Sequence, residues 1–127
     1  MDNCIFCKIV KGDIPSYTIY EDEIVKCFLD INPVNDGHAL IIPKKHYTNL
    51  DDIDLDTLNH IMKVAKDIKK KLDEKLNMGG LRLFQNNGSV QEVKHFHLHL
   101  VPSNGNDIEL ITNTNKKDVK EVFDLLK

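Results

Sequence analysis

The segment His95-Phe96-His97-Leu98-His99-Leu100 places three imidazoles in alternation with three apolar side chains. Residues that alternate in this way lie on opposite faces of a β-strand, so the pattern predicts a strand over 94–101 with its histidines together on one face. Same-face residues lie about 6.6 Å apart along a strand, which separates the outer two histidines by about 13 Å. A zinc–nitrogen bond is only about 2.0–2.1 Å long, so we expect these histidines to divide between two roles rather than to share one metal.

The N-terminal segment contains a candidate half of a metal site. Cys4-Ile5-Phe6-Cys7 is a Cys-x-x-Cys pair, which is typical either of a zinc site or of a thioredoxin-like redox motif. The redox motif follows a strand and opens a helix, whereas only three residues precede this pair, so we favour zinc. Zinc prefers four thiolate or imidazole ligands, and we expect His46, just past a predicted strand, and His95 to complete a structural cage. Cys27 is interpreted as a small buried apolar residue.

His97 and His99 remain free of metal in this assignment. A neutral imidazole can attack phosphorus, and a neighbouring imidazolium can give a proton to a leaving group, so the pair suits acyl or phosphoryl transfer. Polar side chains near the strand are candidates for contacts with an oxyanion: Asn86, Ser89 and Gln91. Their segment lacks the Gly-Lys-Ser/Thr ending of a P-loop. Asp30 follows another predicted strand and is able either to accept hydrogen bonds from two vicinal hydroxyls or to cap a turn.

Length and charge exclude several classes of protein. A chain of 127 residues is long enough for one domain with one core. A net charge of −3 and a pI near 6.0 argue against binding to long nucleic acids. No apolar run is long enough to cross a bilayer, and the polar start of the chain does not resemble a signal peptide, so we expect a cytoplasmic protein without membrane association that acts on a small ligand.

Hydrophobic periodicity and turn residues predict an α+β fold with a mainly antiparallel sheet, one long helix and a short C-terminal helix. The predicted elements are a helical turn over 4–11, strands over 17–20, 24–30 and 38–42, a helix over 54–77, a strand over 80–86, the histidine strand, a short strand over 108–111 and a helix over 118–126. The long helix has apolar residues at three- and four-residue intervals: Leu55, Leu58, Ile61, Met62, Ala65, Ile68, Leu72 and Leu76. We interpret His60 on this helix as exposed and inert.

These motifs resemble the histidine triad (HIT) family. The stretch from His95 to Val101 matches its signature, His-φ-His-φ-His-φ-φ with φ apolar, at every position. Other matching motifs are Cys4-Ile5-Phe6-Cys7-Lys8-Ile9, Gly12-Asp13-Ile14-Pro15, Phe28-Leu29-Asp30-Ile31-Asn32-Pro33 and Gly37-His38-Ala39-Leu40-Ile41-Ile42-Pro43-Lys44-Lys45-His46. They occur in the order found in the Hint-like branch of the family, in its bacterial zinc-containing type, and together they cover nearly the whole chain.

The resemblance implies a homodimer, with the sheet extended across both subunits, that binds purine nucleoside monophosphates or phosphoramidates. It further implies cleavage of bonds to the α-phosphate through a nucleotidyl-histidine intermediate. By position, His97 matches the nucleophile, His99 the contact to phosphate and leaving group, and Asp30 the ribose ligand. The remaining matched residues are Asn86 on the phosphate side, Phe6, Ile9, Ile14 and Ile31 around the base, Cys4, Cys7, His46 and His95 around zinc, and His38 in a supporting position beside the triad.

One departure from the family pattern leaves other functions open. Glu92 stands where many relatives have a hydroxyl that contacts phosphate, and a carboxylate aimed at a phosphate would repel it. A nucleotide-binding regulatory protein with little turnover is therefore one alternative. A dinucleoside polyphosphate hydrolase, which the Cys-x-x-Cys pair disfavours, is another, and a zinc-stabilised interaction module without a ligand is a third.

Overall fold

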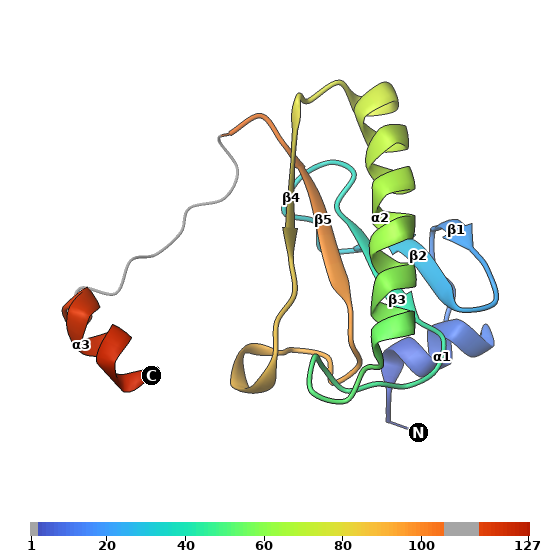
Figure 1. Cartoon of the computed structure of the whole chain (residues 1–127). Coiled ribbons are helices and arrows are strands. Elements are labelled where there is room, and N and C mark those ends of the chain that lie inside the picture. The colour runs from blue at the N-terminus through green and yellow to red at the C-terminus, as the bar shows by residue number, and fades with distance from the viewer. Residues whose placement is uncertain (1–2, 106–114) are drawn as a thin grey trace.

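The computed structural model describes residues 3–105 and 115–127, and its centre is a five-stranded antiparallel sheet with the strand order β1-β2-β3-β5-β4 (Figure 1). The elements are α1 (Ile5–Lys11), β1 (Thr18–Glu21), β2 (Val25–Leu29), β3 (Ala39–Pro43), α2 (Leu55–Leu76), β4 (Gly80–Phe84), the 3-10 turn η1 (Gly88–Val90), β5 (Leu98–Ser103) and α3 (Val119–Leu125). The predicted α+β class is confirmed. The strand predicted over 108–111 lies outside the described residues.

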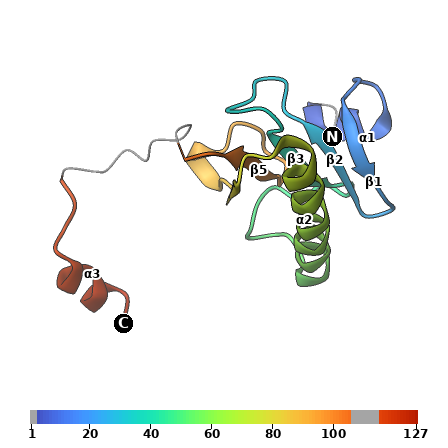
Figure 2. The same cartoon turned by 90° about the horizontal axis from the view of Figure 1, so that it is seen from above.

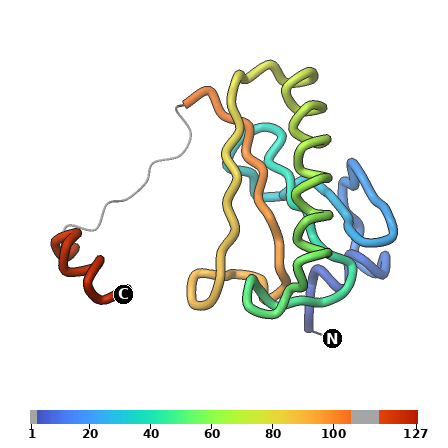
Figure 3. Tube along the Cα trace, in the orientation of Figure 1, coloured from blue at the N-terminus to red at the C-terminus, as the bar shows by residue number. Residues whose placement is uncertain are grey.

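The register of the sheet assembles one functional row from distant parts of the chain. Phe28 pairs with Leu40, Leu40 pairs with His99, and His99 pairs with Phe84. Directly paired residues point to the same side of a sheet, so these four side chains form a row across β2, β3, β5 and β4. Figure 3 shows β4 and β5 side by side, joined at one end by the loop that contains η1.

The opposite face of the sheet packs against α2. Helix α2 begins after the N-cap Asp54, whose side chain accepts a hydrogen bond from the backbone of Thr57, and it ends at Asn77, which has a left-handed φ of 54°. Its buried side chains are Ile61, Val64, Ala65, Ile68 and Leu72. Val64 was missing from the predicted apolar face. Leu55, Met62 and Leu76 were wrongly included, since they are 73%, 42% and 37% exposed.

Helix α1 covers the other face, near the functional row (Figure 2). Phe6 and Ile9 are buried in a second, smaller apolar cluster with the sheet residues Phe28, Leu40 and Ile42. The chain then leaves the helix at Gly12, whose φ of 86° is favourable for glycine and strained for other residues. The sheet therefore separates a large core beneath α2 from a smaller cluster beneath α1.

The histidine strand was predicted over 94–101, but β5 spans Leu98–Ser103, so it begins and ends later than predicted. Ahead of it, the Phe96 amide donates its hydrogen bond to the Tyr47 carbonyl in a loop and not to a neighbouring strand. The alternation itself holds, since Phe96 and Leu98 enter the core beneath α2 while the histidines face the other way. His95 is completely buried.

Two surface predictions have different outcomes. The inert interpretation of His60 is wrong, because its Nε2 lies 2.7 Å from Asp22 Oδ2 and joins α2 to the β1–β2 turn. Helix α3 forms as predicted, yet its apolar residues Val119 and Phe123 are 82% and 61% exposed. None of the described helices is both long enough and apolar enough to cross a membrane.

Candidate functional site

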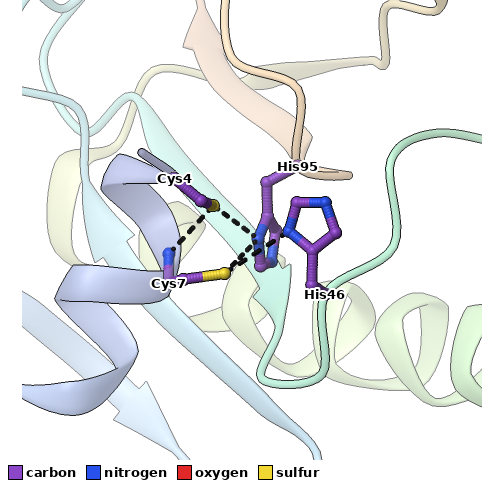
Figure 4. A group of neighbouring side chains, drawn as sticks. All are labelled: Cys4, Cys7, His46 and His95. Carbon is purple, nitrogen blue, oxygen red and sulfur yellow. Dashed lines mark hydrogen bonds between the residues drawn. The ribbon is translucent and has the colours of Figure 1, made fainter. Parts of the chain in front are cut away.

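Two cysteines and two histidines converge beside the start of α1 (Figure 4). Cys4 is the N-cap of α1 and Cys7 lies in its first turn, while His46 comes from the loop after β3 and His95 from the segment before β5. His95 Nδ1 lies 3.3 Å from Cys4 Sγ and 3.5 Å from Cys7 Sγ, and His46 Nδ1 lies 3.4 Å from Cys7 Sγ. All four candidate ligand atoms lie within 4.8 Å of one another, so the four predicted metal ligands do meet.

The spacing of these atoms is suitable for a tetrahedral metal ion. With zinc–sulfur and zinc–nitrogen bonds of about 2.3 and 2.0–2.1 Å, a sulfur and a nitrogen on one tetrahedral ion lie about 3.6 Å apart. The three sulfur–nitrogen distances, 3.3 to 3.5 Å, are close to this value. Two thiolates and two imidazoles also form a donor set that favours zinc over magnesium or calcium.

Hydrogen bonds prepare His95 and Cys4 for this role. His95 Nε2 lies 2.8 Å from the Pro43 carbonyl, to which it donates, so the lone pair of Nδ1 faces the two sulfurs. Burial lowers the His95 pKa to about 4, which keeps the ring neutral. The backbone amide of Cys7 donates to Cys4 Sγ at 3.2 Å. Burial and the neighbouring Cys4 raise the Cys7 pKa to about 11, and a bound dication would favour the thiolate instead.

Hydrogen bonds also define the protonation of His99. The Val34 amide donates to His38 Nδ1 at 3.0 Å, so in the neutral ring of His38 the hydrogen is on Nε2. That nitrogen lies 2.9 Å from His99 Nδ1 and donates to it, which leaves the hydrogen of a neutral His99 on its own Nε2. Burial lowers the pKa of both rings, that of His99 to about 4. The Phe84 ring stacks on His99, with centroids 4.3 Å apart and planes at 14°.

His97 has the complementary arrangement. Its Nδ1 donates to the His95 carbonyl at 2.7 Å, so its Nε2 carries a free lone pair. Burial is the largest influence on the His97 pKa and lowers it, which favours the neutral, nucleophilic form. The ring contacts Phe6 edge to face at 5.0 Å and lies 4.9 Å from the ring of His99. The neighbouring imidazoles therefore offer one acceptor nitrogen and one donor nitrogen.

A cavity of about 460 Å³ opens beside these two rings, within the size range of small-molecule sites. The residues predicted for catalysis or binding that line it are His97, His99, Asp30, Asn86, Phe6, Ile9, Ile14 and Ile31. Asp30 Oδ2 lies 3.6 Å from His38 Nε2, and Asp30 Oδ1 accepts a hydrogen bond from the Asn32 amide. The cavity thus has a polar end at the histidines and an apolar wall from α1.

Two residues predicted for nucleotide binding do not join the others. Gln91 is 4% exposed, and its side-chain amide donates to the Thr48 carbonyl, so it holds two loops together. Ser89 lies in the exposed turn η1. Neither residue lines the cavity.

Sequence reasoning also missed several lining residues: Phe28, Leu40, Phe84 and Val93. The first three belong to the row across the sheet that includes His99. Only the pairing register of the strands identifies them, because the residues of the row are far apart in the sequence. Glu92 was noted for its unusual residue type, and the structure adds that it lines the cavity.

Comparisons with known proteins agree with this geometry. A family model described as the HIT domain matches residues 11–106. An uncharacterized HIT-like protein of Methanocaldococcus jannaschii is 45% identical over 118 residues, which are 91% of each chain. The adenosine 5′-monophosphoramidase HNT1 of Saccharomyces cerevisiae is 45% identical over 101 residues, 78% of this chain and 61% of that protein.

A solved structure is also similar to the whole described fold. The crystal structure of a zinc-bound histidine triad family protein from Mycobacterium smegmatis has a TM-score of 0.81 and 37% sequence identity, with 98% of this chain and 91% of that chain covered. The matched domain covers most of the chain and includes the complete triad motif. The protein therefore belongs to the HIT domain family.

Proposed function

We propose that this protein is a nucleotidyl hydrolase that cleaves purine nucleoside 5′-phosphoramidates or related compounds at the α-phosphate. The observation that carries the proposal is the complementary protonation of His97 and His99 at the polar end of one cavity. The similar yeast protein is named for hydrolysis of an adenosine monophosphoramidate, which supports this substrate class.

The substrate fits the two ends of the cavity. Phe6, Ile9, Ile14 and Ile31 provide apolar surface for the purine base. Asp30 accepts hydrogen bonds from the ribose hydroxyls, and its contact with the Asn32 amide holds the carboxylate in place. The amide of Asn86 donates to a phosphate oxygen. The α-phosphate then lies beside both imidazoles.

In the first step, the Nε2 lone pair of His97 attacks phosphorus and forms a phosphorus–nitrogen bond. The bond from phosphorus to the leaving nitrogen breaks, and its electron pair stays on that nitrogen. The neutral His99 donates a hydrogen bond from its Nε2 to the leaving nitrogen, which takes from solvent the proton that completes the amine. A free amine and a nucleotidyl-His97 intermediate result.

Water completes the reaction. It attacks the phosphorus of the intermediate and releases a proton to solvent, while the bond to His97 breaks and returns the electron pair to Nε2. The products are a nucleoside monophosphate and the starting form of the protein. His38 holds the His99 ring in one tautomer through the 2.9 Å hydrogen bond.

Zinc has a structural role in this proposal. Cys4, Cys7, His46 and His95 would hold the ion, and all four positions of a tetrahedron would then be filled by protein, as in structural zinc sites. When bound, the ion neutralises the thiolates and joins α1 to the segment that carries His97.

A homodimer completes the proposal. Strand β4 is an edge of the sheet, and Leu83 on it is 45% exposed, so a second copy can extend the sheet across this edge. Light scattering during gel filtration should give twice the mass of one chain, and the mass of one chain would contradict dimerisation.

Turnover of adenosine 5′-phosphoramidate by the pure protein tests the function. We expect release of adenosine monophosphate by the wild type and its loss in His97→Ala. The His60→Gln variant, altered at a histidine outside the cavity, should retain turnover. Nucleotide binding without turnover by the wild type would instead favour the regulatory alternative.

A further inference from the structure

The cavity has an unusual charge for a site that accepts a phosphate. Among the described residues that line it, Asp30 and Glu92 are the only ones with formal charges at neutral pH, and no lysine or arginine is present. Sites that hold phosphates commonly supply such cations. Here the protein contributes negative charge to a site whose proposed substrate is itself an anion.

The two carboxylates have different surroundings. Asp30 has an amide donor at 2.9 Å and His38 at 3.6 Å. Glu92 is exposed at the rim, and among the described residues its side chain makes no hydrogen bond or ion pair. Glu92 lines the same cavity as His97 and His99. A carboxylate without a cation partner is therefore available to a bound molecule.

We propose, on the basis of the function proposed above, that Glu92 selects substrates whose leaving group carries a positive charge. A leaving amine with a second, protonated amino group would place that ammonium near the rim, where Glu92 can pair with it. The attraction offsets the repulsion between Glu92 and the phosphate. After cleavage the cationic amine departs, and the remaining nucleoside monophosphate is repelled, which favours product release.

The exposure of Glu92 determines how large the preference for a cationic leaving group should be. Ion pairs between solvent-exposed groups contribute little because water and salt screen them, and a factor of about two to five in kcat/KM is expected. Higher salt should reduce this preference. A neutral leaving group of equal length would gain nothing from the carboxylate.

Two matched substrates test the proposal. One is adenosine 5′-phosphoramidate substituted on nitrogen with a 4-aminobutyl group, and the other carries a butyl group. The wild type should prefer the aminobutyl compound by about two- to fivefold in kcat/KM, and Glu92→Gln should reduce the ratio to about one. The control Glu23→Gln alters an exposed glutamate outside the cavity and should keep the wild-type ratio.

The outcomes separate this proposal from the function on which it rests. Turnover of both compounds with the same ratio in the wild type and in Glu92→Gln would refute the role of Glu92 and leave the hydrolase intact. Turnover of neither compound by the wild type would overturn both. A ratio that falls in Glu92→Gln and also falls with added salt in the wild type would support the proposal.

Discussion

Removal of one thiolate from the cysteine–histidine cluster should make the protein insensitive to zinc. Cys7→Ser takes away the sulfur that lies 3.4 Å from His46 Nδ1 and 3.5 Å from His95 Nδ1. Cys27→Ser is the matched control, because Cys27 is also a free cysteine but lies fully buried in the core beneath α2, away from the cluster. Both variants replace a cysteine sulfur with an oxygen, one inside the cluster and one outside it.

The expected increase in stability on zinc binding follows from the linkage between binding and folding. A ligand present at a hundred times its dissociation constant stabilises the folded state by about 2.7 kcal/mol. For a chain of 127 residues, each kcal/mol corresponds to about 3–6 °C in Tm, so zinc should raise the wild-type Tm by about 8–16 °C. Cys27→Ser buries a hydroxyl and should cost about 1–3 kcal/mol, with the zinc response retained.

Thermal unfolding followed by circular dichroism, with zinc and with a chelator, measures these responses. We expect a large zinc-dependent shift in the wild type and in Cys27→Ser, and almost none in Cys7→Ser. Elemental analysis of the same samples should find one zinc per chain except in Cys7→Ser. A wild-type Tm that does not respond to zinc or chelator, or a normal shift in Cys7→Ser, would refute the metal site.

Three further predictions concern the histidines and Glu92. His38→Phe should lower kcat for adenosine phosphoramidate by tenfold or more with a smaller change in KM, because His99 loses its 2.9 Å hydrogen bond; an unchanged kcat would contradict the positioning role. Glu92→Ser should tighten the binding of adenosine monophosphate in calorimetry, since it removes a like charge; an unchanged or weaker dissociation constant would mean that the carboxylate acts elsewhere. The chelated protein should lose stability to urea between pH 6.5 and 5. Burial lowers the pKa values of His38, His97 and His99, the last to about 4, so the unfolded chain binds protons at a higher pH than the folded protein does. Equal urea midpoints at pH 7 and pH 5 would refute this.

Local signals in the sequence predicted the parts of the fold that depend on neighbouring residues. The helix predicted over 54–77 has the same ends as the observed caps of α2, Asp54 and Asn77, because capping preferences come from the backbone within one turn. The Cys-x-x-Cys pair, the first histidine of the triad and His46 just past a predicted strand were expected as four metal ligands, and the structure brings all four together. These signals are strong because each depends on a fixed geometry over a few residues.

Other features depend on tertiary contacts that no local pattern encodes. Gln91 binds the Thr48 carbonyl because the loops that carry them meet in space, and His60 meets Asp22 in the same way. Strand β5 begins later in the chain than predicted because the Phe96 amide donates its hydrogen bond to the Tyr47 carbonyl in a loop. Such partners become evident only when the tertiary structure is known.

The identity of the nucleophile is the central claim, and a covalent adduct tests it most directly. The protein should be mixed rapidly with an adenosine 5′-phosphoramidate, quenched, digested and analysed by mass spectrometry under conditions that preserve phosphorus–nitrogen bonds. We predict a nucleotidyl group on His97, whose Nε2 is free while its Nδ1 donates to the His95 carbonyl. An adduct on His99, or full turnover by His97→Ala, would contradict the account.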